Sequence, residues 1–379
     1  MTALSNKQAQ AAPVSAPNQA VAQAYVLHQQ AVMLEDEHQY EEAIACMLKA
    51  LTLGPQIPEI HLEMALLLLR RGEFGPGLLE YEWRWRLKER ANRLPRFGVP
   101  QWNGMRLPRG RIVLHADQGA GDKVQFCRYI PMVAERCREV FVTSAPSTAK
   151  LLQGVKGVTA VTTDIRKLPP VDVFCTLSSL PLVFDTRVDN IPDTVPYLSV
   201  EPEKVSTWKS RLDQCVPAGS LRVGISWAGS AEHIKDKWRS TRLEQWSDVL
   251  GVPDVAFISL QKEVPEADRL PLASENRLID FTSELGDFSD TAALIQNLDL
   301  VLSVDTSVTH LAGALGKPAW VLLQWVPDWR WLMDREDSPW YPTMRLYRQE
   351  VKDDYSRPLQ RIAHNLRNFC TTASRKSVR

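Results

Sequence analysis

A polar motif that follows an apolar segment carries the clearest chemical signal in the sequence. Residues 298–304 are predicted to form a buried strand, and Asp305, Thr306 and Ser307 follow it before a helix that a Gly-Lys-Pro sequence terminates. In an open α/β sheet, such a junction leaves backbone amides free at the carboxyl end of the strand, where the helix dipole favours an anion. The pattern therefore predicts a site for a phosphate or diphosphate group.

Asp305 needs a separate role in this site, because a carboxylate repels a neighbouring phosphate. We assign Asp305 to capping the helix or to accepting a hydrogen bond from a sugar hydroxyl, and we leave the phosphate contact to Thr306 and Ser307. An ordinary capped helix without any ligand has the same local pattern.

A similar junction lies nearer the N-terminus. A predicted strand at 111–115 is followed by Gly119 and Gly121, which let a turn approach a ligand closely, and by Asp122 at the start of a helix. A carboxylate in this position is suited to take a proton from an acceptor hydroxyl, so Asp122 is the candidate general base. As a lone Gly-Asp pair, the motif is more often a simple helix cap.

Alternating apolar strands and helices must position these two junctions. The predicted strands lie at 111–115, 140–143, 171–175, 221–226, 255–260, 298–304 and 319–323. Their separations leave room for helical crossovers, which predicts two parallel βαβ units. Pro131 falls inside a helix predicted over 123–138 and should kink or split it.

The domain boundaries follow from this pattern and from the composition between the units. We assign residues 111–205 to a first α/β unit, 220–350 to a second, and 351–379 to a C-terminal helix and tail. Residues 91–110 are rich in proline and glycine and are predicted to be a linker.

Residues 21–90 are predicted to be helical and to contain an internal repeat. Four positions recur at an offset of 34 residues, which is the tetratricopeptide period: Ala31, Leu34, Tyr40 and Ile44 return as Ala65, Leu68, Phe74 and Leu78. Because a free solenoid usually needs at least three repeats, two such units should dock on the neighbouring domain. A plain helical hairpin with a coincidental offset is the alternative. Residues 1–20 are predicted to be a disordered tail.

The composition narrows the function classes. Lys+Arg and Asp+Glu both number 45, so no global basic field favours nucleic acid or an anionic membrane. No apolar run approaches the length of a membrane span, and no secretory signal is evident. The six cysteines show no zinc spacing, and we expect buried thiols, no metal, no cofactor and a cytoplasmic protein.

These motifs together resemble bacterial tetratricopeptide-repeat proteins with a glycosyltransferase family 9 (heptosyltransferase-like) domain, over most of residues 22–350. The matching stretches are 118–122, 125–129, 177–181, 191–192, 196–198, 227–229, 239–240, 259–261, 290–295, 304–318 and 327–331. Each piece alone is weak, and their order and number make the match specific.

The resemblance implies a GT-B fold, in which two Rossmann-like domains face a cleft, with the nucleotide-sugar donor on the second unit and the acceptor on the first. It implies inversion at the sugar carbon without a divalent ion, and neither junction carries an Asp-x-Asp pair that would hold one. The nucleotide-sugar is then a substrate, and the helical repeats are candidates to engage a protein or glycan acceptor.

The resemblance also distributes the site residues. Asp122 is the candidate base, and Gln118, Gly119 and Gly121 lie on the acceptor side. The donor-binding residues are Asp305, Thr306, Ser307, His310, Arg239, Ser240 and Gln261. Arg239 and Ser240 would offer charge and hydrogen bonds to the leaving phosphate, although an ordinary surface loop is the competing interpretation.

Two departures from the family pattern weaken the transfer of function: Asp117 replaces an expected glutamate, and Ala120 replaces a larger aliphatic residue. Three tryptophans in 324–331 could stack on a base or sugar, or simply pack in the core.

Two other functions stay open at this point. The chain could be a catalytically silent relative that binds nucleotide and recruits a partner through its repeats. A dinucleotide-dependent oxidoreductase is a poorer fit, because no predicted strand is followed by G-x-G-x-x-G and a distant acidic residue.

Overall fold

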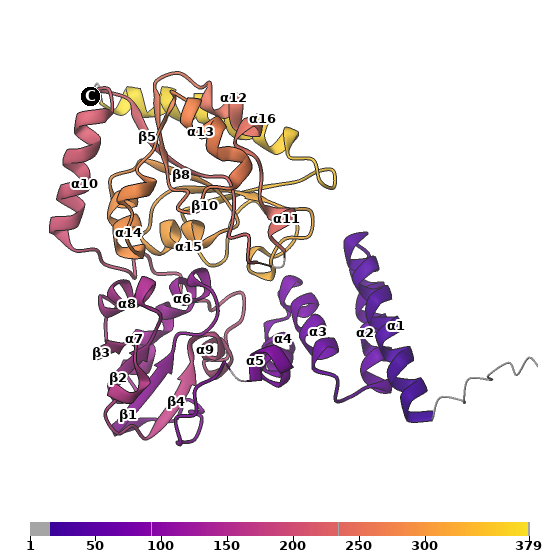
Figure 1. The fold of residues 1–379 in the computed structure, drawn as a ribbon. Helices are drawn as coiled ribbons and strands as arrows, with labels where there is room; N and C mark the ends of the chain where they lie inside the picture. The colour runs from indigo at the N-terminus through magenta and orange to yellow at the C-terminus, as the bar shows by residue number, and fades with distance from the viewer. Residues whose placement is uncertain (1–15, 92, 234, 378–379) are drawn as a thin grey trace, which may run out of the picture.

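A computed structural model describes residues 16–91, 93–233 and 235–377. Figure 1 shows three parts: a helical segment at one side, and two α/β units stacked on each other with their helices α6 (Ala120–Phe126) and α15 (Ser307–Ala314) at the boundary. The predicted division into a helical segment followed by two α/β units is visible in this arrangement.

The helical segment consists of two successive helical hairpins. Its elements are α1 (Ala16–Asp36), α2 (Tyr40–Leu53), α3 (Pro58–Arg70), α4 (Phe74–Tyr81), the 3-10 helix η1 (Glu82–Arg86) and α5 (Lys88–Ala91). Helix α1 packs on α2, and α3 packs on α4. Tyr40 and Phe74 each open the second helix of a hairpin, and Ala31 and Ala65 are buried, as the 34-residue offset predicts.

The predicted tail at 1–20 is partly wrong. Residues 16–20 belong to the first turns of α1, and residues 1–15 lie outside the described residues. The alanine and glutamine that suggested a disordered tail are also good helix formers, so composition alone does not separate the two states here.

The first α/β unit contains a parallel sheet with strand order β3-β2-β1-β4. The strands are β1 (Leu107–His115), β2 (Cys137–Thr143), β3 (Ala160–Thr162) and β4 (Val173–Thr176). The helices are α6, η2 (Cys127–Tyr129), α7 (Ile130–Ala134), α8 (Pro146–Gln153), η3 (Ile165–Lys167), η4 (Leu177–Ser179) and α9 (Leu180–Val183). The helix containing Pro131 is split as predicted, because α6 passes through the short η2 before α7 begins.

The second unit contains a larger parallel sheet with strand order β10-β9-β8-β5-β6-β7. The strands are β5 (Leu221–Ser226), β6 (Val255–Ser259), β7 (Leu278–Ile279), β8 (Leu300–Val304), β9 (Ala319–Leu323) and β10 (Met344–Arg348). The helices are α10 (Pro202–Cys215), α11 (Asp236–Arg239), η5 (Leu243–Trp246), α12 (Ser247–Leu250), η6 (Glu266–Asp268), α13 (Arg269–Ser274), η7 (Thr282–Glu284), α14 (Phe288–Gln296), α15, η8 (Trp329–Trp331) and α16 (Ser356–Ser377). The C-terminal helix α16 packs on this unit.

Several elements differ from the sequence prediction. The short strands β3 and β7 have too few residues for an alternating pattern, and they were missed together with β10. Helix α10 lies in the Pro- and polar-rich stretch that separates the two units, where Pro202 occupies its first turn and only Trp208 and Leu212 are buried. Strand β1 starts at Leu107, inside the predicted linker.

The helical segment docks on the second unit through polar links. The Nε of Arg70 donates to the carbonyl of Pro327 at 2.9 Å, and the indole Nε1 of Trp325 donates to the carbonyl of Asp36 at 2.8 Å. Arg70 also forms a buried ion pair with Glu35. The two hairpins therefore belong to the folded body, as expected for an array with too few repeats to stand alone.

An aromatic cluster completes this docking surface. The ring of Phe74 stacks on Trp340 with centroids 5.9 Å apart and meets Trp329 edge-on at 5.7 Å. Both tryptophans come from the second unit, so the start of α4 is anchored in its core.

We predict that Phe74→Ala destabilises the protein by about 3–5 kcal/mol, since a 2% exposed aromatic side chain would leave a cavity. Leu79→Ala, on the same helix but 62% exposed, is the control and should change stability by less than about 0.5 kcal/mol. Guanidinium unfolding of both variants measures the difference. Equal unfolding midpoints would show that α4 is not anchored by this ring.

Candidate functional site

The two strand-to-helix junctions meet at the boundary between the α/β units. Helices α6 and α15 pack together with Gly121 at the contact. A Cβ atom at Gly121 would lie 2.8 Å from Cδ2 of His310 and 3.5 Å from Cα of Ser307. Glycine is therefore required by close approach of the second unit, which puts the predicted acceptor-side and donor-side motifs in direct contact.

Asp122 lies in the first turn of α6 at this boundary. One carboxylate oxygen accepts a hydrogen bond from the amide of Gly119 at 3.0 Å, and the other forms an ion pair with Arg330 of the second unit. Burial raises the pKa of Asp122, and the positive charge of Arg330 opposes that rise. The cap interpretation is correct for one oxygen, while the second oxygen faces across the boundary.

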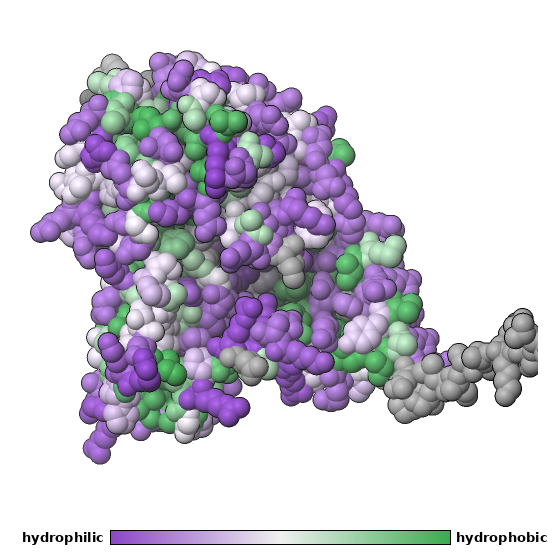
Figure 2. Space-filling view, in the orientation of Figure 1, coloured by the Kyte–Doolittle hydropathy of each residue, from purple (hydrophilic) through white to green (hydrophobic). Residues whose placement is uncertain are grey.

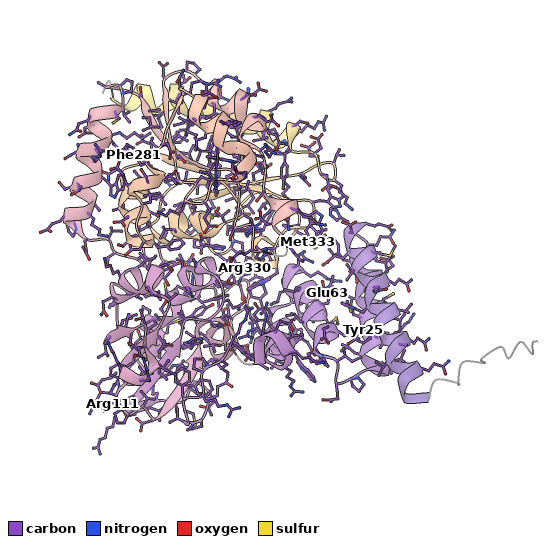
Figure 3. The ribbon with its side chains drawn as sticks, in the orientation of Figure 1. Tyr25, Glu63, Arg111, Phe281, Arg330 and Met333 are labelled. Atoms are coloured by element: carbon purple, nitrogen blue, oxygen red, sulfur yellow. The ribbon has the colours of Figure 1, made fainter. Side chains whose placement is uncertain are left out.

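Arg330 is the residue that sequence reasoning missed. It belongs to η8, which follows β9, and it is only 6% exposed. Its guanidinium pairs with Asp328 at 2.8 Å and with Asp122, and its Nε donates to the side chain of Gln125. Although burial disfavours its charge, Asp328 and Asp122 raise the pKa of Arg330. Figure 3 shows Arg330 where the three parts of the protein come together.

The start of α15 matches the predicted anion site in geometry. Thr306 is the N-cap in an extended conformation, and its side chain makes no capping hydrogen bond to the first turn of the helix. The hydroxyl of Thr306 is buried, 3.2 Å from the hydroxyl of Ser303, whereas Ser307 is half-buried. Ser307 is thus the better placed of the two for a ligand contact.

Asp305 does not cap the helix, because Thr306 occupies the N-cap position. That part of the prediction is wrong, and the role of accepting a ligand hydroxyl stays a prediction. Burial, together with the negative charge of Asp328, raises the pKa of Asp305 to about 6. Its backbone carbonyl accepts a hydrogen bond from Nη1 of Arg239 at 3.0 Å.

Arg239 reaches this junction from α11, while its neighbour Ser240 does not point into it. The Nε of Arg239 also contacts the carboxylate of Asp236 at 3.1 Å. The Ser240 hydroxyl accepts a hydrogen bond from the amide of Gly229 at 2.8 Å and so stabilises the loop after β5. The structure therefore brings the Arg239 charge to the start of α15 and gives Ser240 a supporting contact.

Gln261 is buried in the second unit, and both of its polar atoms are used inside the protein. Its Oε1 accepts the amides of Trp227 and Ala228 at 3.1 and 3.0 Å, and its Nε2 donates to the carbonyls of Ala228 and Glu263 at 3.0 and 2.8 Å. The side chain holds the loops after β5 and β6 together, and these contacts leave it no group to offer a ligand.

His310 is held inside α15 and remains neutral. Its Nδ1 is hydrogen-bonded to the hydroxyl of Tyr341 at 2.9 Å, and its ring stacks on Trp331 with centroids 5.3 Å apart. Burial, assisted by the charge of Arg330, lowers the pKa of His310 to about 3. The ring therefore offers packing and a neutral nitrogen to the site, not a charge.

The acceptor-side residues form a tight turn before α6. Gln118 has a left-handed φ of 64°, and its side-chain amide donates to the hydroxyl of Tyr81 at 3.1 Å. Gly119 is the N-cap of α6 and is exposed. The turn thus presents its glycine to solvent and fixes its glutamine against the helical segment.

Within residues 16–91, 93–233 and 235–377, no three His, Cys, Asp or Glu side chains are grouped to hold an ion. Over the same ranges, no helix combines the length and apolarity of a membrane span.

Five cysteines are buried, and Cys215 is exposed, which corrects the expectation of six buried thiols.

A cavity of about 670 Å³ lies between the helical segment and the second unit. It is lined by His38, Gln39, Tyr40, Glu41, Glu42, Arg70, Arg71, Leu332, Met333, Asp334, Arg335 and Asp337. The lining carries both signs of charge, and Arg71 is paired with Glu41 at 2.6 Å. The loop that follows Arg330 therefore forms one wall of a polar cavity.

Comparison with known proteins gives a partial match to a family. Residues 255–322 match the family model of glycosyltransferase family 9 (heptosyltransferase). The matched range contains Thr306, Ser307 and His310 and does not reach Asp122. Protein FlbA of Caulobacter vibrioides is 26% identical over 374 residues, and the alignment covers 91% of this chain and 61% of FlbA. The chain thus spans about 61% of the length of this curated relative.

Two solved structures are similar to part of this chain at low identity. A glycosyl transferase family 9 protein of Veillonella parvula has a TM-score of 0.49 and 10% identity, covering 68% of this chain and 92% of that one. The ADP-heptose lps heptosyltransferase II of E. coli has a TM-score of 0.48 and 13% identity, covering 69% and 99%. The family match over β6, β8 and α15 supports a glycosyltransferase.

Proposed function

We propose that the protein is an inverting, metal-independent glycosyltransferase of the GT-B type, with tetratricopeptide-like repeats at its N-terminal side. One observation carries the proposal: the carboxyl-end junctions of two parallel sheets meet, so that Asp122 of the first unit lies against α15 and Arg330 of the second. Ligands of open α/β sheets bind at this edge, outside the carboxyl ends of the strands.

The donor side of the proposed site is the start of α15. Its amides and the hydroxyl of Ser307 bind the diphosphate of a nucleotide-sugar, and Thr306 shapes the cap. Arg239 and Arg330 supply positive charge near this anion, and Asp305 accepts a sugar hydroxyl. Negative charge that develops on the leaving diphosphate is then stabilised by groups already in place.

The acceptor side supplies the base. Asp122 removes the proton of an acceptor hydroxyl while that oxygen bonds to the anomeric carbon of the donor. The bond from this carbon to the diphosphate breaks on the opposite face, so one displacement inverts the configuration and releases a nucleoside diphosphate. The proton is transferred to the carboxylate of Asp122. Before the reaction, the ion pair between Asp122 and Arg330 keeps this carboxylate oriented.

The acceptor itself is proposed to engage the helical segment. The cavity between α2 and the loop after η8 is formed jointly by that segment and the donor-binding unit, and its polar lining suits a protein or glycan chain. A catalytically silent nucleotide-binding scaffold is the alternative. It is not favoured, because Asp122, Arg330 and the start of α15 are brought together as a transfer reaction requires.

Substitution of Ser307 tests the donor site. Proline is tolerated at the first helical position, but it removes the amide and the hydroxyl that we assign to the diphosphate. We expect Ser307→Pro to weaken binding of a nucleoside diphosphate at least tenfold at unchanged secondary structure. The measurement is a thermal shift with UDP, GDP, ADP and dTDP, since ligands that bind only the native state raise its stability. Unchanged shifts in the folded variant would contradict this site.

Replacement of Asp122 tests the base. Asp122→Asn keeps the side-chain shape and the hydrogen bond from Gly119, but it removes the proton acceptor and the charge that pairs with Arg330. Turnover should fall by roughly 10²–10⁴-fold with little change in donor affinity. The competing cap role predicts that both properties persist. Near-normal kcat in this variant would exclude Asp122 as the base.

The pH profile separates Asp122 from Asp305, the second half-buried carboxyl at this junction. A base must be ionised, so activity should rise with pH through the raised pKa of Asp122, above the ordinary aspartate value of about 3.9. His310, with its pKa of about 3, should not contribute. We expect Asp122→Asn to abolish this acidic limb and Asp305→Asn to retain it. The reverse pattern would assign the limb to Asp305.

Metal independence has its own test. The proposed site offers amides and basic side chains where metal-dependent enzymes use paired carboxylates, so activity should survive EDTA. Complete loss in EDTA, with recovery on addition of Mn²⁺ or Mg²⁺, would contradict the proposal.

A further inference from the structure

Arg84 is a fully buried arginine that the proposed reaction does not use. It belongs to η1 of the helical segment and is 0% exposed. One terminal nitrogen, Nη2, donates to the hydroxyls of Ser178 and Ser179 at 2.8 Å each, and both serines belong to the first α/β unit. The other, Nη1, contacts Glu82 at 2.6 Å. A buried charge with this many partners ties two parts of the protein together.

Ser178 connects Arg84 to the turn that leads to Asp122. The parallel register pairs His115 of β1 with Thr176 of β4, so the residues two positions beyond each strand, Asp117 and Ser178, are neighbours. The amide of Ser178 donates to Oδ1 of Asp117 at 3.1 Å, and its hydroxyl donates to Oδ2. A continuous path therefore runs from Arg84 through Ser178 to Asp117.

The turn held by this path is under backbone strain. Gln118 adopts a left-handed φ of 64°, which costs a non-glycine residue roughly 1–3 kcal/mol when the conformation is sparsely populated. It is fixed by Tyr81, whose ring lies 4.5 Å from the guanidinium carbon of Arg84. The helical segment thus holds both residues that precede Gly119. It holds Gln118 directly through Tyr81, and it holds Asp117 through the link from Arg84 to Ser178.

The buried carboxyl of Asp117 explains why the link through Ser178 needs a positively charged residue at position 84. Asp117 is buried, and burial raises its pKa while the charge of Arg84 opposes that rise. Without Arg84, the turn would hold a buried carboxylate with less compensation, and such a group relaxes toward water or takes up a proton. Either response would alter the hydrogen bonds between Asp117 and Ser178 that hold the turn before α6.

We propose that Arg84 is a positioning residue for Asp122: it anchors the turn 117–121 through Ser178, so the helical segment completes the catalytic site and is more than a binding module. The anchoring of this turn by Arg84 does not depend on the proposed reaction. Only its kinetic consequence rests on the proposed function.

Ser178→Ala is the decisive variant, because it removes the hydroxyl that joins Arg84 to Oδ2 of Asp117. The backbone amide at this position still donates to Oδ1 of Asp117, and Arg84 stays paired with Ser179 and Glu82. Thr176→Val is the matched control: its hydroxyl lies 2.7 Å from that of Ser179 and 3.5 Å from Nη2 of Arg84, so the variant trims the same cluster and keeps the Ser178 link to Asp117. Arg84→Met removes the anchor itself. Lys352→Met removes an ion pair between Asp36 and the second unit, so it controls for loosening the helical segment elsewhere.

Two measurements on the full-length protein decide the proposal. Hydrogen exchange of the amides in 117–124 should accelerate at least tenfold in Ser178→Ala and Arg84→Met, and remain at the wild-type rate in Thr176→Val and Lys352→Met. Turnover should fall by about 10–100-fold in the first pair, the scale of a 1 Å displacement of a catalytic group, at unchanged affinity for the nucleoside diphosphate.

The outcomes are distinguishable. Unchanged exchange in Ser178→Ala would overturn the proposal, even if Arg84→Met fails to fold. Equal acceleration in all four variants would also overturn it, since it would indicate general loosening. If the wild-type protein shows no transfer, the proposed function fails, and the exchange data still decide whether Arg84 anchors the turn.

Discussion

The structure depends on one buried charge at the boundary between its α/β units. Arg330 is taken out of water, and a buried guanidinium is costly unless carboxylates and hydrogen bonds surround it. Asp328 meets this requirement from its own loop, and Asp122 meets it from the first unit. Because the partners lie on different units, satisfying the charge also fixes how the two sheets face each other.

Buried arginines with polar partners also join the helical segment to the α/β units. Arg70 pairs with Glu35 and reaches Pro327, and Arg84 reaches Ser178 and Ser179. Ion pairs of this kind add little net stability compared with apolar packing, but leaving one partner unpaired is costly. They therefore favour one docking arrangement over others, while rings such as Phe74 supply the apolar contact. Figure 2 shows hydrophilic residues over most of the visible face, with hydrophobic patches on the α/β units as well as on the helical segment.

The sequence predicted what depends on local pattern. Strand β5 was placed at its observed bounds, and the split at Pro131 followed from proline chemistry. Arg330 could not be found this way, because its partner Asp122 is 208 positions away and only the fold brings them together. An arginine in an aromatic loop at the carboxyl end of a strand was the available signal. Gln261 shows the opposite error, since a polar residue after a strand was assigned to a ligand and instead joins two loops.

These contacts change how the helical segment relates to the rest of the chain. A docked recruitment module needs only a surface for its partner, and its attachment to the body can be loose. Here Tyr81 contacts Gln118 in the turn before α6, and Arg84 reaches the same turn through Ser178, which is hydrogen-bonded to Asp117. The turn has a strained residue and a glycine that must touch the opposite unit, so small displacements would separate Asp122 from Arg330. A segment that supports such a turn is part of the site, which explains why its interface is lined by buried arginines.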